Sequence, residues 1–150
     1  KKLHIPEPIR WNMIRKTTRD NARTPMQWTD GQNAGFTTGT PWLPVNPNYT
    51  EINVKSQINN PDSVRNFYKK MIAMRSESEI LKFGDFKAVE TGKHIFAYKR
   101  TYNGQSMTIA LNFSPFEQKF EYSGETLISN CGTKVFRGIL KPYEAVVIKN

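Results

Sequence analysis

The sequence predicts an α+β chain: a loop-rich, helical part over residues 1–79 and a small antiparallel β-sandwich over residues 80–150. Three observations lead to this prediction. Residues 1 to about 60 are rich in Pro, Asn, Thr and Gly and show little periodicity. An amphipathic helical pattern follows them. From Ile80 onward the spacing of apolar residues changes from about 3.6 to about 2.

The composition fits a folded chain that is free of disulfides. With 150 residues, an apolar fraction of 37% and 18 aromatic residues, it is the size of one domain or of two incomplete pieces. No apolar run approaches the ~20 residues that span a membrane, and Lys1–Pro6 has no secretory h-region. The single cysteine, Cys131, excludes an internal disulfide and fits a reducing compartment, so we expect a cytoplasmic protein with no membrane partner.

The net charge of +9 raises the question of nucleic-acid binding. The basic residues are spread along the chain, with one concentration between Lys1 and Arg23. No zinc-finger spacing and no ribonucleoprotein motif is present, so we expect no nucleic-acid partner. His4 and His94 stand far apart, and the glycines have no phosphate-loop spacing. We therefore expect no metal and no cofactor.

The first part contains one short predicted helix and a long irregular run. Apolar residues such as Ile9 and Met13 predict a helix over Pro8–Lys16. Turn signals then recur at Thr24-Pro25, Asp30-Gly31, Gly39-Thr40-Pro41 and Asn46-Pro47-Asn48. A structureless run of this length is unusual inside a compact domain, so it is either a functional loop or a segment that packs against another surface.

A second helix is predicted over Asn60–Ser78. Asn60 is a good N-cap residue, and Pro61 suits the first helical position because that position needs no N–H. The helical spacing of apolar residues continues through Val64, Phe67, Tyr68, Met71 and Ile72. This apolar stripe is broad, so we expect it to pack against a substantial partner surface.

The last part reads as strands joined by short turns. Asn103-Gly104 is the strongest hairpin signal, because both central positions of such a turn need positive φ. Several short strands with turns every eight to twelve residues are typical of an antiparallel sandwich. The predicted strands are Asp85–Val89, His94–Arg100, Ser106–Phe113, Gln118–Tyr122, Thr126–Ser129, Lys134–Phe136 and Glu144–Lys149.

Four runs in the first part carry a resemblance to a known family: RDNARTPMQW (19–28), NAGFTTGTPW (33–42), VNPNY (45–49) and EINV (51–54). With the predicted helix and the KPYEA run at 141–145, they cover essentially the whole chain. Together they closely resemble the family 13 glycoside hydrolases of the α-amylase superfamily. The likeness is to the members that act on short α-glucosides, the oligo-1,6-glucosidase and dextran glucosidase type.

The resemblance implies an architecture and an activity. Family members have a catalytic (β/α)8 barrel followed by an antiparallel β-sandwich. Residues 1–79 would be the end of the barrel, comprising the loop after strand eight and the last helix, and residues 80–150 the sandwich. The implied enzyme is an α-glucosidase that hydrolyses terminal α-1,6-linked glucose of isomalto-oligosaccharides by a retaining mechanism.

The family's catalytic carboxylates, one Asp nucleophile and one Glu acid/base, lie upstream of this region. The acidic residues available here match none of their motifs: Asp20, Asp30, Glu51, Asp62 and Glu77. We therefore expect no catalytic residue in this chain and no activity from it alone. Its substrate partners, short α-glucoside oligosaccharides, would be bound through the missing barrel. Without the barrel, the exposed apolar face of the second helix would favour self-association.

One substrate-binding residue carries over from the family motif. The second arginine of the RDNAR run, Arg23, would reach the pocket that holds the non-reducing glucose. Its rigid fork suits a sugar hydroxyl and a carboxylate together. The alternative is that Arg23 only pins the loop, with Asp20 as its neighbour. Aromatic residues of the same segment would either stack on sugars or, as we favour, pack on the barrel: Trp11, Trp28, Trp42 and Tyr49.

Two further alternatives remain open from the sequence. The chain could act as a non-catalytic β-sandwich module that binds carbohydrate or braces a partner. Within the glucosidase interpretation, preference among α-1,6 and α-1,4 linkages, sucrose and phosphorylated trehalose depends mostly on barrel loops outside this chain. The VNPNY and EINV runs favour the oligo-1,6 type by analogy alone.

Overall fold

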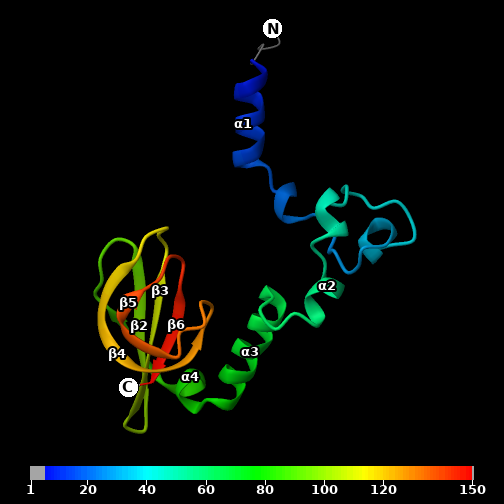
Figure 1. Cartoon of the computed structure of the whole chain (residues 1–150). Coiled ribbons are helices and arrows are strands. Elements are labelled where there is room, and N and C mark those ends of the chain that lie inside the picture. The colour runs from blue at the N-terminus through cyan, green and yellow to red at the C-terminus, as the bar shows by residue number, and fades with distance from the viewer. Residues whose placement is uncertain (1–5, 150) are drawn as a thin grey trace. The chain divides into compact units, whose positions relative to one another are not determined.

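The structure, a computed structural model, describes residues 6–149, apart from the side chain of Asn21. Residues 1–5, with His4 and the predicted absence of an h-region, lie outside the described part. The chain divides into two compact units, Lys1–Asn66 and Phe67–Asn150. Helices and turns make up the first unit, and an antiparallel sheet dominates the second (Figure 1). The predicted α+β class is confirmed.

The first unit contains more local structure than the sequence predicted. Helix α1 (Glu7–Thr17) matches the expected helix, and Pro8 occupies its first turn. The run that followed, expected to be structureless, folds into four short elements. They are the 3-10 turns η1 (Asp20–Ala22), η2 (Gln32–Gly35) and η3 (Pro47–Thr50), and helix α2 (Val54–Ile58).

Helix α3 (Val64–Glu77) begins four residues later than the predicted start at Asn60. The Asn60 side chain instead accepts a hydrogen bond from the N–H of Asp62 (3.0 Å) and forms a turn. Ser63 takes the capping role, because its Oγ accepts a hydrogen bond from the N–H of Asn66 (3.2 Å). The prediction of Asn60 as N-cap was wrong because two cap-type residues compete, and the one nearer the apolar stripe caps the helix.

The apolar stripe of α3 is exposed in the described chain. Val64, Tyr68 and Ile72 are 74%, 64% and 62% exposed, and no residue of α3 is buried. A short helix α4 (Glu79–Phe83) follows, with the Ser78 Oγ accepting a hydrogen bond from the N–H of Leu81 (3.3 Å). An amphipathic helix of this length normally buries its stripe, so α3 retains a large surface available for packing.

The second unit is built on one six-stranded antiparallel sheet, with strand order β1-β2-β3-β6-β4-β5. The predicted hairpin is confirmed: Asn103 and Gly104 have φ of 49° and 77° between β2 and β3. The two strands expected at 118–122 and 126–129 form one strand, β4, with two register shifts. The strands are β1 (Asp85–Val89), β2 (Ile95–Tyr102), β3 (Gln105–Asn112), β4 (Gln118–Ser129), β5 (Val135–Leu140) and β6 (Ala145–Lys149).

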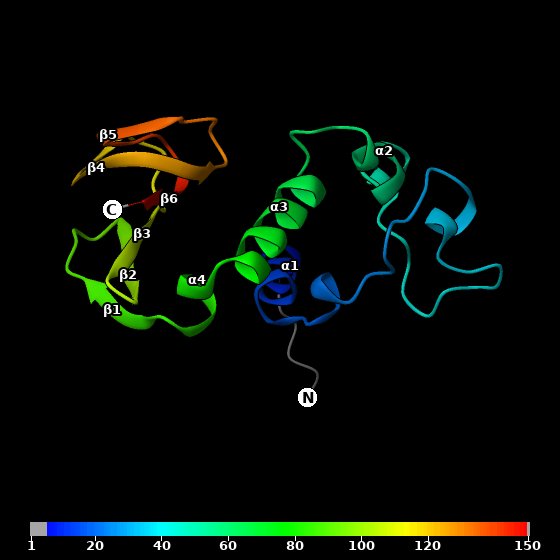
Figure 2. The same ribbon diagram turned by 90° about the horizontal axis from the view of Figure 1, so that it is seen from below.

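Side-chain alternation gives the sheet a packed core on each face. The larger cluster joins residues of β2, β3, β4, β5 and β6: Ala97, Ala110, Phe120, Phe136, Leu140, Val146 and Ile148. The sheet curves so that β4 and β5 lie over β2 and β3 within this unit (Figure 2). On the other face Leu81 of α4 packs with Ile109 and Val147.

A buried carboxylate, Glu144, joins the β4–β5 and β5–β6 connections of the second unit. Glu144 is 1% exposed, and its side chain accepts hydrogen bonds from Ser129 Oγ (2.7 Å), Thr133 Oγ1 (2.5 Å) and the N–H of Lys141 (2.9 Å). Burial raises the pKa of Glu144. The hydrogen bonds and the nearby Lys141 charge together lower it by more, so the pKa lies below its ordinary value. The ionised form therefore stabilises the fold.

We expect the second unit to lose stability in acid through Glu144. A carboxyl whose pKa is lowered in the folded state contributes stability above its unfolded pKa of about 4.3 and loses it as the pH falls through the folded value. Urea unfolding of Glu144→Gln should give an unfolding free energy about 1–3 kcal/mol lower at pH 7 and a flatter dependence below about pH 5.

The control is Glu121→Gln, which changes an exposed carboxylate of β4. Identical pH dependence in wild type and Glu144→Gln would contradict the role given to this carboxylate.

Candidate functional site

The predicted substrate-binding residue, Arg23, follows η1 and is exposed. Its backbone N–H donates to the carbonyl of Asp20 (3.0 Å). Within the part of the chain that the structure describes, its guanidinium has no hydrogen-bond or ion-pair partner. It lines a depression of about 250 Å³ together with Thr24, Pro25, Met26, Phe36, Trp42 and Leu43. Arg23 is thus a free cationic fork beside an apolar wall, and its role remains a prediction.

The segment after Arg23 is held by the side chain of Gln27. Its Nε2 donates to Asn48 Oδ1 (3.0 Å) and to the carbonyl oxygen of Ile52. Two backbone hydrogen bonds run beside it, from Val54 N–H to Gln27 O (2.9 Å) and from Lys55 N–H to Trp28 O (3.0 Å). The carboxamide therefore fastens the start of the loop to η3 and to Ile52, and the two backbone hydrogen bonds fasten it to α2, more than twenty residues further on.

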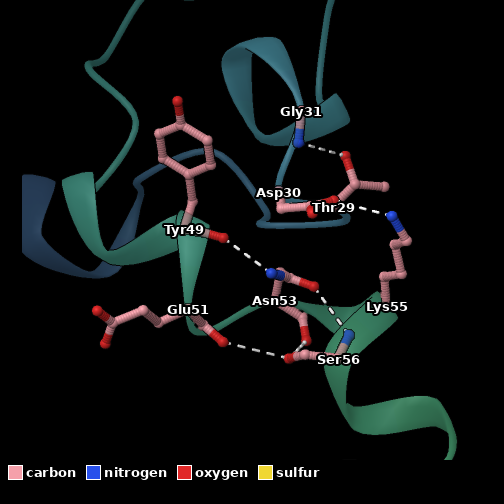
Figure 3. Close-up of polar contacts among 8 residues, drawn as sticks. All are labelled: Thr29, Asp30, Gly31, Tyr49, Glu51, Asn53, Lys55 and Ser56. Carbon is pink, nitrogen blue, oxygen red and sulfur yellow. Dashed lines mark hydrogen bonds and ion pairs between the residues drawn. The ribbon is translucent and has the colours of Figure 1, made fainter.

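Asn53 organises the start of α2 in the same manner (Figure 3). It is 4% exposed, its Nδ2 donates to Tyr49 O (2.9 Å), and its Oδ1 accepts from the N–H of Ser56 (2.9 Å). Ser56 Oγ in turn donates to the carbonyl of Asn53 (2.8 Å). Asn53 is therefore both the N-cap of α2 and the link from α2 back to η3.

The tip of the loop adopts a left-handed turn. Asn33, Ala34 and Gly35 have φ of 50°, 55° and 67°, which costs about 1–2 kcal/mol per non-glycine residue. The turn is held because Ala34, fully buried, accepts hydrogen bonds at its carbonyl from the N–H groups of Trp28 (2.9 Å) and Thr29 (3.0 Å). Asn33 Nδ2 closes it on Gly39 O (2.8 Å).

Two acidic residues of the first unit, Asp30 and Glu51, have visibly different surroundings (Figure 3). Asp30 binds Lys55 Nζ at 3.0 Å, and that hydrogen bond holds the pKa of Asp30 below its usual value. Figure 3 shows the Glu51 side chain pointing away from Asp30 and Lys55. An ionised, ion-paired Asp30 is unsuited to donate a proton at neutral pH.

The aromatic residues singled out from the sequence are largely exposed. Trp42 is 87% exposed, and Trp11 and Trp28 are 50% and 48% exposed, whereas Tyr49 is half-buried. Only Trp42 shares the depression with Arg23, and Phe36, which is 48% exposed, lies there with it. The structure thus brings two aromatic rings to the predicted binding residue, one of which the sequence did not single out.

Other classes of site find little support among residues 6–149. In this described part, no group of three or more His, Cys, Asp or Glu side chains is placed to hold a metal ion. The helices found there are too short or too polar to cross a membrane. Cys131 is a free thiol, and burial raises its pKa. In residues 19–57, the predicted ligand-binding donor is Arg23, which lines the depression described above.

Sequence reasoning did not identify Gln27, Asn33 and Asn53 as the residues that shape this site. Their signal was present as a high content of Asn and Gln in a loop of low periodicity. Such side chains carry both donors and acceptors and so can replace backbone partners where no helix or sheet exists. The hydrogen-bond partners of these side chains could not be predicted from the local sequence.

Comparison with known proteins gives a consistent set of relatives. The family described as "Alpha amylase, catalytic domain" matches residues 5–84. The chain is 47% identical over 142 residues to an oligo-1,6-glucosidase of Bacillus cereus, with 87% of this chain and 25% of that protein covered. It is 40% identical to a glucan 1,6-alpha-glucosidase of Streptococcus pneumoniae, with 91% and 26% covered.

Solved structures agree in fold. The trehalulose synthase of Pseudomonas mesoacidophila MX-45 superposes with a TM-score of 0.80 at 38% identity, covering 88% of this chain and 26% of that one. The isomaltulose synthase of Klebsiella sp. LX3 superposes with a TM-score of 0.86 at 33% identity, covering 97% and 28%. The chain thus spans about a quarter of the length of the proteins it matches.

We expect the left-handed turn to depend on Gly35. A Cβ at Gly35 would lie 2.7 Å from Thr29 Oγ1, and its φ of 67° is strained for other residues. Gly35→Ala should open the loop and raise the rate of tryptic cleavage after Arg23 and Lys55, on the order of tenfold for a cost near 1.4 kcal/mol.

Gly39→Ala is the matched control, because a Cβ there makes only an ordinary contact with Thr37 Oγ1 at 3.7 Å. Equal cleavage rates in the two variants would show that the turn does not hold the loop.

Proposed function

Because the chain belongs to the alpha-amylase family of glycoside hydrolases, we propose that it is the C-terminal part of an α-glucosidase. The proposed reaction is hydrolysis of terminal α-1,6-linked glucose of isomalto-oligosaccharides by a retaining mechanism. The observation that carries this proposal is the 40–47% identity, over about nine-tenths of the chain, to proteins named for α-1,6-glucosidase activity.

The proposed domain division is residues 1–79 as the end of a catalytic (β/α)8 barrel and residues 80–150 as a C-terminal β-sandwich. The match of the catalytic-domain family to residues 5–84 supports the first part. The core cluster shared by β2, β3, β4 and β5 supports the second, because a sandwich buries the facing sides of its strands. The exposed stripe of α3 supplies the surface that a barrel would cover.

In this proposal the chain supplies binding, and the catalytic carboxylates come from elsewhere. A retaining glycosidase needs two carboxyl groups about 5–5.5 Å apart, one as nucleophile and one as acid/base. Here Asp30 is ion-paired with Lys55 and Glu144 is enclosed by hydrogen bonds. Arg23, by contrast, is free to donate from its planar fork to a sugar hydroxyl and to a neighbouring carboxylate. Gln27 and Asn53 fix the loop that follows Arg23 in the chain.

A second candidate activity comes from the solved relatives. Their names describe trehalulose and isomaltulose synthases, and one of those structures holds sucrose as substrate. An isomerase of sucrose would use the same retaining chemistry with a different acceptor. We favour the glucosidase because the two α-1,6-glucosidases named above are 40–47% identical to this chain, against 33–38% for the two synthases.

We expect the 150-residue chain to leave isomaltose and p-nitrophenyl α-glucoside intact, and a protein extended upstream through a full barrel to hydrolyse both. In the longer protein Arg23→Ala should lower kcat/KM by about 10²-fold or more, because a charge-assisted hydrogen bond in a closed site is lost. Arg23→Lys tests whether charge alone suffices.

Activity in the short chain would mean that the carboxylate assignment is wrong and that Asp20, Asp30 and Glu51 are the candidates. Sucrose conversion without isomaltose hydrolysis would favour the synthase. The same short chain should self-associate through the α3 stripe, and a sedimentation coefficient independent of concentration would contradict that.

A further inference from the structure

The second unit has a hollow that the proposed function does not use. It lies where the junction between α3 and α4 faces the β2–β3 hairpin, far along the sequence from Arg23, and it measures about 510 Å³. That size falls within the range of sites for small molecules. Figure 1 shows α4 beside the hairpin of β2 and β3, and α4 packs against both strands.

The floor of the hollow is apolar. Met74, Ile80 and Met107 line it, and Ile80 is only 8% exposed. Met74 and Met107 pack against the smaller core cluster of the sheet. Gly84 allows α4 and β2 to approach each other closely, because a Cβ at this position would lie 2.5 Å from the carbonyl oxygen of Ile80 and 3.0 Å from that of Thr101. The helix and β2 therefore meet at a set distance.

Polar side chains of two complementary kinds surround this floor. Glu77 and Glu79 flank the junction of the helices, and Asn103 and Gln105 come from the hairpin. All four are exposed, and their side chains have no hydrogen-bond or ion-pair partner among the described residues. The carboxylates supply acceptors only, whereas each carboxamide supplies both donors and an acceptor.

An aromatic ring completes one wall. Tyr102 lines the hollow and is half-buried, with its ring 6.1 Å from that of Phe83. Planar carboxylates and carboxamides next to an aromatic ring and an apolar floor match a ring that has hydroxyl groups on its edge and C–H groups on its faces. We propose that this hollow is a non-catalytic binding site for a pyranoside, such as one glucosyl unit of an oligosaccharide.

A cation is a poorer fit to the same residues. Only two carboxylates are present, and no group of three metal-ligating side chains occurs among the described residues. An amine or a metal would use only the oxygen atoms of these side chains and leave the N–H donors of Asn103 and Gln105 to water, and an apolar ligand would use none of the four polar groups. The pyranoside class follows from the side chains alone. The choice of α-1,6-linked probe rests on the proposed function.

The test is titration of the whole 150-residue chain with isomaltotriose and, separately, maltotriose, followed by ¹⁵N–¹H NMR. We expect saturable shifts at residues 77–80 and 102–107 with a Kd on the order of 1 mM. Glu77→Ala combined with Gln105→Ala should weaken binding about tenfold, because two exposed hydrogen-bonding groups are removed without touching the core. Glu121→Ala, an exposed carboxylate on β4, should bind as wild type does.

Each outcome decides the proposal. Saturation by maltotriose alone supports pyranoside binding in the hollow and counts against the α-1,6 preference of the proposed function. No saturable shift with either sugar overturns the inference and leaves the proposed hydrolysis untouched. Shifts centred elsewhere or unchanged affinity in the double variant would each overturn it as well. A parallel titration with spermidine that shifts the same residues, when neither sugar does, would also overturn it.

Discussion

The carboxamide of Gln27 lies where the start of the loop meets η3 and α2, and its Nε2 bonds to Asn48 Oδ1 and to the carbonyl of Ile52. Apolar burial contributes little here, because Pro25 and Ala34 are the buried apolar residues among the described residues 24–57. Without helix or sheet ladders, every interior backbone group needs a side-chain or turn partner. The shape of the loop that follows Arg23 therefore depends on a few amide side chains.

Much of the fold could be predicted because its determinants are local. Strand alternation located the sheet, and Asn103-Gly104 located a hairpin whose φ values require those residues. The errors came where local signals compete. Asn60 and Ser63 are both good N-cap residues, and Ser63 caps α3. The backbone N–H of Asn66 donates to Ser63 Oγ, and the Asn66 side chain donates to the carbonyl of Asn60. The two strands predicted at 118–122 and 126–129 join in β4 at Gly124. Because this residue has no side chain, β6 can approach so closely that a Cβ there would lie 2.6 Å from Lys149 O.

Less of the candidate site could be predicted, for a physical reason. Arg23 was found through a family motif, since nothing in spacing or periodicity marks one exposed arginine. The side chains that hold its loop, Gln27 and Asn53, act over separations from 3 to 25 residues and leave no periodic pattern. The polar hollow by Glu77 and Gln105 depends on α4 packing against β2 and β3, which is a tertiary contact. Sequence thus predicted the chemistry of one residue, and the structure identified the side chains that shape the loop beside it.

The measurement that tests this account most directly is amide hydrogen exchange at Val54 and Lys55 in the 150-residue chain. Their N–H groups donate to Gln27 O and Trp28 O, so they report on the closure of the loop. The account predicts protection of both amides, lost together in Gln27→Ala while the sheet amides of β3 and β6 keep theirs. Exchange of Val54 and Lys55 at the rate of an unfolded chain in the unsubstituted protein would contradict it, because the loop would then need another surface to order Arg23.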